Sequence, residues 1–194
     1  MRDMIKLFVV VALFSMVAGG LLASVREATK EKIEVQQLTF VKGPALNQIL
    51  MGCTNNPLDD RFKLKADGKD IDFFVAEFEN KKNTVAFETY GKGFGGDIGV
   101  IVAVNLDTDE IVGIGVTTHS ETPGLGSRAK SDPTFAEQFK GLSINNPFKV
   151  KSDGGEIDAI SGATVTSRGV CAAVTAASEI YKQYKSEILK NIQA

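Results

Sequence analysis

The chain has 194 residues, 43% of them hydrophobic, which is enough for one medium-sized globular domain and an additional segment. Its 22 basic and 24 acidic residues give a formal net charge of −2, so the chain lacks the basic surface of a nucleic-acid-binding protein. A single histidine and two cysteines, Cys53 and Cys171, exclude a histidine-rich metal site and a Cys-x-x-Cys zinc pattern.

Residues 7–25 form an uncharged apolar run. At ~1.5 Å per helical residue the run is just long enough to cross the ~30 Å hydrocarbon core of a membrane. The alternative is a cleavable signal peptide, with Arg2 and Lys6 as its basic region and small residues near Ala18-Gly19-Gly20 or Ala23 as the cleavage site. We favour an anchor, because the run exceeds the usual apolar core of a signal peptide and helix-forming residues follow it directly. The positive charges on its two sides are nearly balanced and do not decide its orientation.

A helical stalk to about Gln37 and a short helix over residues 44–50 are predicted next. Five strand patterns then follow in series, over residues 61–65, 71–79, 84–90, 98–106 and 111–118. Turn sequences such as Asp67-Gly68 separate them, and successive hairpins favour an antiparallel sheet over βαβ units. The predicted organisation is a membrane anchor over residues 1–25, a stalk and short helix over 26–60, and a domain over 61–194.

Helices are expected to cover this sheet. A short helix is predicted after the acidic cap Asp132, with Pro133 at its first position, and residues 149–150 are a candidate edge strand. A long Ala-rich helix from Thr164 to about Ile192 closes the domain. Its predicted buried stripe consists of Val165, Val174, Ala177, Tyr181, Tyr184 and Ile188. The predicted fold class is therefore α+β: an N-terminal transmembrane helix followed by a twisted antiparallel sheet with flanking helices.

The segment 158–167 places a turn-prone Ser161-Gly162 step directly before the long helix. Unpaired backbone N–H groups and the helix dipole make such a helix start suitable for a phosphate group. The hydroxyls of Ser161, Thr164, Thr166 and Ser167 crowd this turn, more than helix capping requires. For the Ser-Gly-Ala-Thr tetrad alone, a simple helix cap is the alternative explanation.

The segment Glu121-Thr122-Pro123-Gly124-Leu125-Gly126 follows the last predicted strand. Pro123-Gly124 favours a turn, and the glycines would let a flat ligand approach the backbone N–H groups. His119, just before it, is either a ligand of this site or a solvated loop residue. A Gly-x-Gly-x-x-Gly pattern, typical of dinucleotide-binding sites, occurs at Gly91-Lys92-Gly93-Phe94-Gly95-Gly96. In such sites a helix follows the glycines, whereas here a strand pattern follows. We therefore predict an ordinary glycine-rich loop.

Asp158-x-x-Ser161-Gly162-Ala163-Thr164 resembles the flavinylation motif of the FMN-binding domain family. This family includes the G subunits of Rnf electron-transport complexes and the C subunits of sodium-translocating NADH:quinone reductases. Its members attach FMN through the phosphate to the hydroxyl of the last threonine of the motif, by a dedicated flavin transferase. The resemblance extends to Glu121–Gly126 and covers most of the chain, and the chain length favours the G-subunit branch.

The resemblance implies that Thr164 carries covalent FMN, with Thr166 as the fallback acceptor. It implies that Ser161, Gly162 and Ala163 surround the linkage, that Asp158 is recognised by the transferase, and that the segment 121–126 lies beside the isoalloxazine ring. The implied function is electron transfer within an ion-translocating ferredoxin:NAD oxidoreductase complex, with the other subunits as partners. The implied location is the inner membrane, crossed once, with the domain on the extracytoplasmic side.

Alternatives from other classes remain at this stage. The chain could be a stand-alone extracytoplasmic flavin reductase, or a membrane-tethered binding or sensor module without redox chemistry. No hydrolase site is predicted, because the one histidine cannot supply a convincing Ser-His-Asp or Cys-His arrangement. Cys53 and Cys171 are either two buried or semi-buried thiols, which we favour, or a disulfide in an oxidising compartment.

Overall fold

The computed structural model describes residues 1–66 and 68–193. The chain forms two compact units, Met1–Phe40 and Val41–Ala194, so the division falls inside the predicted stalk segment. The first unit consists mainly of the helix α1 (Arg2–Gln37), which has no buried residue and ends where the stalk was predicted to end. Within the described part of the chain, one helical run near the N-terminus is long and apolar enough to cross a membrane, and α1 forms most of it.

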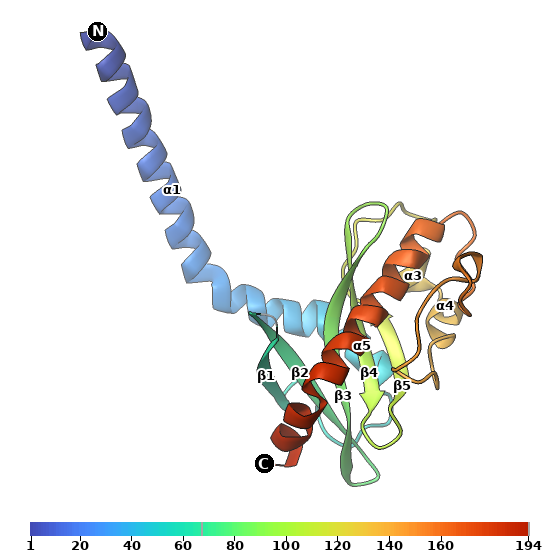
Figure 1. Ribbon diagram of the computed structural model, residues 1–194. Helices are drawn as coiled ribbons and strands as arrows, with labels where there is room; N and C mark the ends of the chain where they lie inside the picture. The colour runs from blue at the N-terminus through green and yellow to red at the C-terminus, as the bar shows by residue number, and fades with distance from the viewer. Residues whose placement is uncertain (67, 194) are drawn as a thin grey trace. The chain divides into compact units, whose positions relative to one another are not determined.

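The second unit is built on a five-stranded antiparallel sheet in which each strand pairs with the next along the chain (Figure 1). The strands are β1 (Arg61–Ala66), β2 (Lys69–Phe78), β3 (Lys81–Lys92), β4 (Asp97–Asn105) and β5 (Glu110–Val116). The predicted series of hairpins is therefore confirmed. In the β1–β2 turn, Asp67 lies outside the described residues, whereas Gly68 has a φ of 78°.

The turn between β2 and β3 is shorter than the gap between the predicted strands 71–79 and 84–90. Glu79 and Asn80 have φ values of 52° and 62°, and β3 already begins at Lys81. Two consecutive residues with positive φ form the kind of tight turn whose twist matches that of the flanking strands. The turn therefore contains only Glu79 and Asn80 between paired strands.

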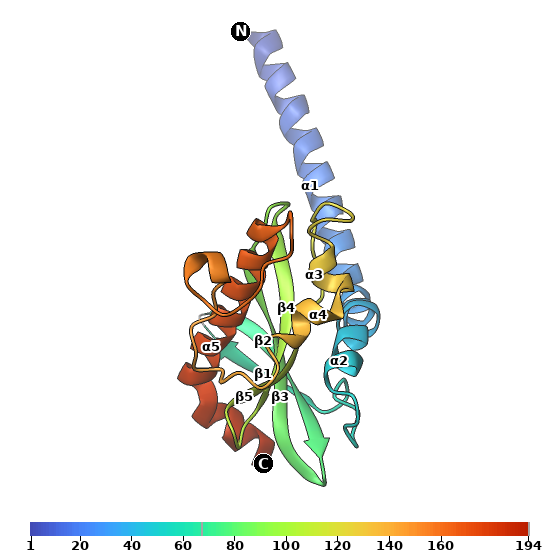
Figure 2. The same cartoon turned by 90° about the vertical axis from the view of Figure 1, so that its right-hand side faces the viewer.

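Helices cover both faces of the sheet (Figure 2). On one face, the long helix α5 (Thr164–Gln193) packs on a row in which Phe73, Phe87, Val102 and Ile114 stand opposite one another. On the other face, α2 (Gly43–Ile49) follows a π-helical turn (Leu38–Lys42) and places Ile49 against Gly113 of β5. The core therefore has two layers, and α5 and the sheet enclose the larger one.

Short elements fill the β5 side of the domain: α3 (Arg128–Ser131), α4 (Pro133–Glu137) and a 3₁₀ turn (Lys151–Asp153). The prediction for α4 is confirmed, because Asp132 Oδ1 accepts a hydrogen bond from the Thr134 N–H at 3.1 Å and Pro133 follows directly. The candidate edge strand at residues 149–150 is wrong, because Val150 forms only an isolated parallel bridge with Ile157.

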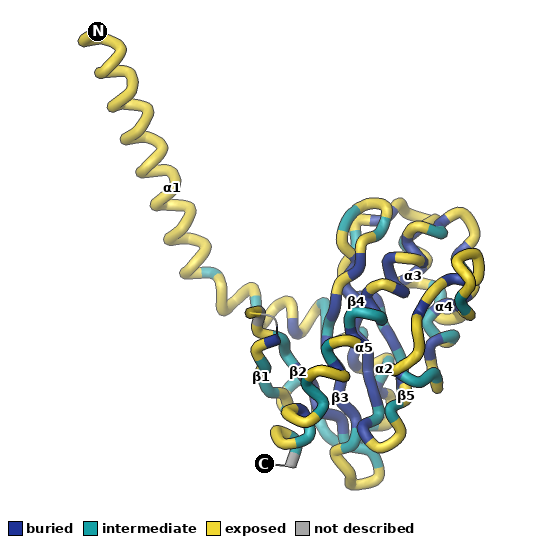
Figure 3. Tube along the Cα trace, viewed as in Figure 1, coloured by how far each residue is buried: buried dark blue, intermediate teal, exposed yellow. Residues whose placement is uncertain are grey.

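The predicted buried stripe of α5 is confirmed for Val174, Ala177, Tyr181 and Ile188 and is wrong for Val165. Val165 is 44% exposed. It lies nine residues before Val174, which at ~100° per residue places it about 180° away, on the opposite side of the helix. Figure 3 shows the resulting alternation of buried and exposed positions along the helix. Tyr184 is half-buried at the flank of the stripe.

Both cysteines are free thiols, Cys53 half-buried and Cys171 buried in α5. Burial raises the pKa of the Cys171 thiol to about 11. We therefore expect iodoacetamide at pH 8 to modify Cys53 in the folded protein and Cys171 only after unfolding, because the thiolate is the nucleophile. Peptide mass mapping measures this order. A requirement for a reductant before either thiol reacts would instead show a disulfide.

Candidate functional site

Three segments that are far apart in the sequence meet around one open pocket with a volume of about 420 Å³. They are the loop between β3 and β4, the segment after β5, and the first turn of α5. The pocket is lined by Phe94, Glu121, Thr122, Leu125, Gly126, Gly162, Ala163, Thr164, Val165 and Thr166. The two segments singled out in the sequence, 121–126 and 158–167, therefore both contribute to this pocket, the second through residues 162–166.

Thr164 is the first residue of α5 and is half-buried in the pocket wall. The first turn of a helix leaves backbone N–H groups without intrahelical partners, and its dipole favours an anion. Among the described residues, no hydrogen bond partner is present for the Thr164 hydroxyl. The residue predicted to carry the cofactor thus combines a free hydroxyl with a helix start suited to a phosphate group.

The turn before α5 is held by Ser167 rather than by Ser161. Ser167 Oγ accepts a hydrogen bond from the Ile160 N–H at 3.0 Å and donates one to the Ala163 carbonyl oxygen at 3.1 Å. Ser161 and Gly162 are exposed, and Gly162 has a φ of 77°, a conformation that glycine adopts without strain. Helix capping by Ser161, the simple alternative for this tetrad, does not occur.

Glu121 is buried, and both of its carboxylate oxygens accept hydrogen bonds. Oε1 accepts from the Gly95 backbone N–H at 2.8 Å, and Oε2 accepts from the Thr166 hydroxyl at 2.5 Å. Glu121 and Thr166 are 6% and 2% exposed. The Thr166 hydroxyl, unlike that of Thr164, is therefore turned into the protein and already engaged.

The predicted turn in the segment after β5 has its tip at Pro123 and Gly124. The Thr122 carbonyl oxygen accepts hydrogen bonds from the N–H groups of Leu125 and Ser127, each at 3.2 Å. Thr122, Leu125 and Gly126 line the pocket, whereas Pro123 and Gly124 are exposed at the tip. The Leu125 side chain is 48% exposed and forms part of the pocket wall.

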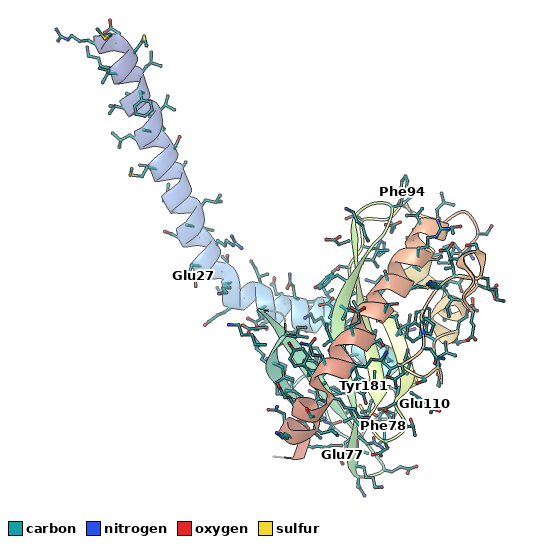
Figure 4. All side chains as sticks on the ribbon, in the orientation of Figure 1. Glu27, Glu77, Phe78, Phe94, Glu110 and Tyr181 are labelled. Atoms are coloured by element: carbon teal, nitrogen blue, oxygen red, sulfur yellow. The ribbon has the colours of Figure 1, made fainter. Side chains whose placement is uncertain are left out.

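Sequence reasoning missed two apolar residues of the pocket, Phe94 and Val165. Phe94 is 76% exposed in the β3–β4 loop, where Figure 4 shows it near the tip. Val165 is exposed on the first turn of α5. The signal for Phe94 was present in the sequence, as a lone aromatic residue between glycines that no strand or helix pattern buries. The glycine-rich run itself joins two strands, as predicted.

Asp158 and His119 are not among the residues that line the pocket. The exposed Asp158 carboxylate forms an ion pair with Lys151 at 2.7 Å, and its backbone N–H donates to Gln138 Oε1 at 2.7 Å. His119 Nδ1 accepts a hydrogen bond from the Glu121 N–H at 3.3 Å. Among residues 1–66 and 68–193 there is no group of three His, Cys, Asp or Glu side chains arranged to hold a metal ion.

Comparison with known proteins gives consistent similarities. Residues 93–179 match the sequence profile of the FMN-binding domain, and this range contains all three segments of the pocket. The G subunit of the ion-translocating oxidoreductase complex of Cereibacter sphaeroides is 34% identical to this chain, over 91% of the chain and 84% of that protein. The G subunits of the complexes of Shewanella piezotolerans and Pseudomonas aeruginosa are 30% and 31% identical, over 97% of the chain and 94% and 93% of those proteins.

Two solved structures are also similar to this chain. They are the C subunit of the Na⁺-translocating NADH-quinone reductase from Parabacteroides distasonis and NqrC from Shewanella oneidensis. Their sequence identities are 26% and 29%, each with a TM-score of 0.48. Each match spans 64% of this chain and 64% of the solved chain, slightly less than two thirds of its length.

Proposed function

The chain belongs to the family formed by the G subunits of ion-translocating oxidoreductase complexes, and from this premise we propose that it carries one FMN covalently on Thr164. Family membership supports an electron-transfer flavoprotein within such a complex. The covalent linkage rests on a single observation: the free Thr164 hydroxyl lies at the start of α5, inside the pocket formed by 121–126 and 161–166.

The residues of the pocket fit an FMN group. Its volume of about 420 Å³ lies in the range of small-molecule sites, which is ~300–1,000 Å³. Phe94, Leu125 and Val165 present exposed apolar side chains that suit the faces of a flat ring. The N-terminus of α5 suits the phosphate. Bound FMN supplies reversible uptake and release of electrons, and the protein supplies its position and surroundings.

Attachment requires only the Thr164 hydroxyl from this chain. A bond forms between Thr164 Oγ and the flavin phosphorus, and the bond from that phosphorus to the other half of the flavin donor breaks. That half departs with the electron pair as the leaving group, and the Thr164 hydroxyl proton passes to it or to solvent. We propose that a flavin transferase supplies the donor. The exposed Asp158 lies outside the pocket wall, which supports a role in recognition by that enzyme rather than in electron transfer.

We further propose that α1 anchors the protein in the inner membrane and that the domain lies on the extracytoplasmic side. The length and apolar composition of α1 support the anchor. A covalent bond would keep the flavin from being lost by diffusion on that side. The partners would then be the other subunits of a complex that moves electrons between ferredoxin and NAD and couples this transfer to ion transport.

The test is intact-mass analysis and in-gel ultraviolet fluorescence of the denatured full-length protein, expressed together with a flavin transferase. We expect a mass gain of one FMN less one water, on the peptide that contains Thr164. The unmodified mass from a host in which a known substrate of the same transferase is flavinylated would contradict the proposal, and would favour a binding module that holds its ligand reversibly.

A further inference from the structure

Glu121 is a buried carboxylate whose bonding is completed within the protein. Among the described residues, no lysine or arginine forms an ion pair with it, and its two oxygens instead accept from Gly95 and Thr166. A buried carboxylate is costly unless its oxygens accept hydrogen bonds. Glu121 itself lines the pocket, and each of its oxygens already accepts a hydrogen bond from a different segment of the protein, so the carboxylate connects those segments.

The bonds of Glu121 connect the three walls of the pocket. Gly95 belongs to the β3–β4 loop, Thr166 to the first turn of α5, and Glu121 itself to the segment after β5. These walls also carry the apolar side chains Phe94, Val165 and Leu125. The carboxylate therefore fixes the spacing between the surfaces that would contact a flat ring.

Two glycines make room for this carboxylate. A Cβ atom at Gly93 would lie 2.4 Å from Glu121 Oε1, and a Cβ atom at Gly126 would lie 2.6 Å from Glu121 Oε2. The second would also lie 2.7 Å from Thr166 Oγ1. Gly93 and Gly126 therefore leave the space that the Glu121 carboxylate occupies, in addition to any role in letting a ligand approach the backbone.

We propose that Glu121 and Thr166 are positioning residues, which tie the β3–β4 loop and the segment 121–126 to the first turn of α5. In this way they set how the flavin ring lies relative to the attachment hydroxyl of Thr164, two residues before Thr166. The inference rests on the proposed function and adds roles to it: neither residue is a flavin acceptor, and Glu121 acts through the segments that it joins.

The first experiment measures hydrogen exchange of the Gly95 amide in flavin-free full-length protein, from a host without the transferase. Glu121→Ala removes the acceptor of this amide, and we expect exchange to be at least about tenfold faster. Thr166→Val removes the hydrogen bond between Thr166 and Glu121 but keeps the bond from Gly95 to Glu121. We expect the exchange rate of the Gly95 amide to increase roughly fivefold. Thr166→Ser keeps the hydroxyl, and its Gly95 amide should exchange at the rate seen in the wild-type protein.

Glu121→Gln separates geometry from charge. Its side-chain oxygen can still accept from Gly95, and its NH₂ group can donate to the Thr166 hydroxyl. We expect Gly95 exchange in this variant to stay within about threefold of that of the unmodified sequence, since both connections persist. The variant is also a control for folding: if Glu121→Ala exchanges faster only because the domain unfolds, Glu121→Gln still tests the hydrogen bonds in a folded protein.

The second experiment uses the flavinylated forms. Thr166→Val is expected to retain covalent FMN, because Thr164 is intact, and to show a shifted visible absorption spectrum and lower fluorescence polarisation of the ring. Thr166→Ser is expected to match the unmodified sequence. Unchanged Gly95 exchange in both Glu121→Ala and Thr166→Val, or an unchanged flavin spectrum and polarisation in Thr166→Val, would overturn the positioning role. Absence of covalent FMN from the wild-type protein would overturn the proposed function instead. The exchange measurement uses flavin-free protein, so its result does not depend on that outcome.

Discussion

Thr164→Val is expected to abolish covalently bound FMN while leaving the fold intact. Valine keeps the β-branched shape of threonine but has no oxygen to form the phosphoester bond. Because no described residue hydrogen-bonds the Thr164 hydroxyl, its removal breaks no internal contact, and the free energy of unfolding should change by no more than ~0.5 kcal/mol. In-gel fluorescence and intact mass measure the flavin, and circular dichroism measures the fold.

The matched control is Thr164→Ser, which keeps a hydroxyl at the same backbone position. We expect partial or full flavinylation of this variant, because a serine oxygen can form the same bond. Retention of covalent FMN in Thr164→Val would show that the acceptor is another residue. Transfer of the FMN to Thr166 is not expected, because its hydroxyl is buried and donates to Glu121.

Local patterns were sufficient to predict the architecture of the domain. Each hairpin combines β-branched or aromatic runs with turn residues close in sequence, so neighbouring strands pair without information from elsewhere in the chain. The errors were also local. Val165 was assigned to a buried stripe from its residue type, although its angular position opposes that of Val174.

The functional site was predictable only where its residues are contiguous. The segments 121–126 and 158–167 could be found in the sequence, and residues of both line one pocket. The hydrogen bond between Glu121 and Thr166 joins residues 45 positions apart, and the contact of Gly95 with Glu121 joins residues 26 apart. Such pairings follow from the packing of α5 on the sheet, and periodicity in one sequence does not reveal them.

The close approach between α5 and the sheet depends on two glycines, Gly91 of β3 and Gly169 of α5. An ideal Cβ atom at Gly91 would lie 1.9 Å from the Gly169 carbonyl oxygen and 2.7 Å from the Ala173 backbone nitrogen. One at Gly169 would lie 2.8 Å from the Lys92 carbonyl oxygen. Nearby, the buried Thr89 hydroxyl donates to the Ala173 carbonyl oxygen at 2.8 Å. The atoms nearest to these added Cβ positions belong to the backbone, so no side-chain rotation could relieve the clash.

Gly91→Ala is therefore expected to destabilise the domain strongly. The new methyl group must push α5 away from β3, and overpacking of this kind costs about 3 kcal/mol, at the upper end of the usual range. For a domain of this size each kcal/mol lowers Tm by about 2–4 °C, so we expect a decrease of roughly 6–12 °C. Thermal unfolding followed by circular dichroism measures it in detergent solution. Lys92→Ala, at the next and exposed position of β3, is the control and should change Tm by less than about 2 °C.

The same substitution links packing to the site, because Gly169 lies five residues after Thr164 on α5. A displacement of the helix at Gly169 moves its first turn relative to the β3–β4 loop and the segment after β5, and so separates Thr166 from Glu121 and Gly95. We expect Gly91→Ala to lower the yield of covalent FMN even at temperatures where the domain remains folded, whereas Lys92→Ala should not. A Tm and an FMN yield equal to those of the control would show that the sheet can yield at this contact, and that the close approach of α5 does not determine the geometry of the pocket.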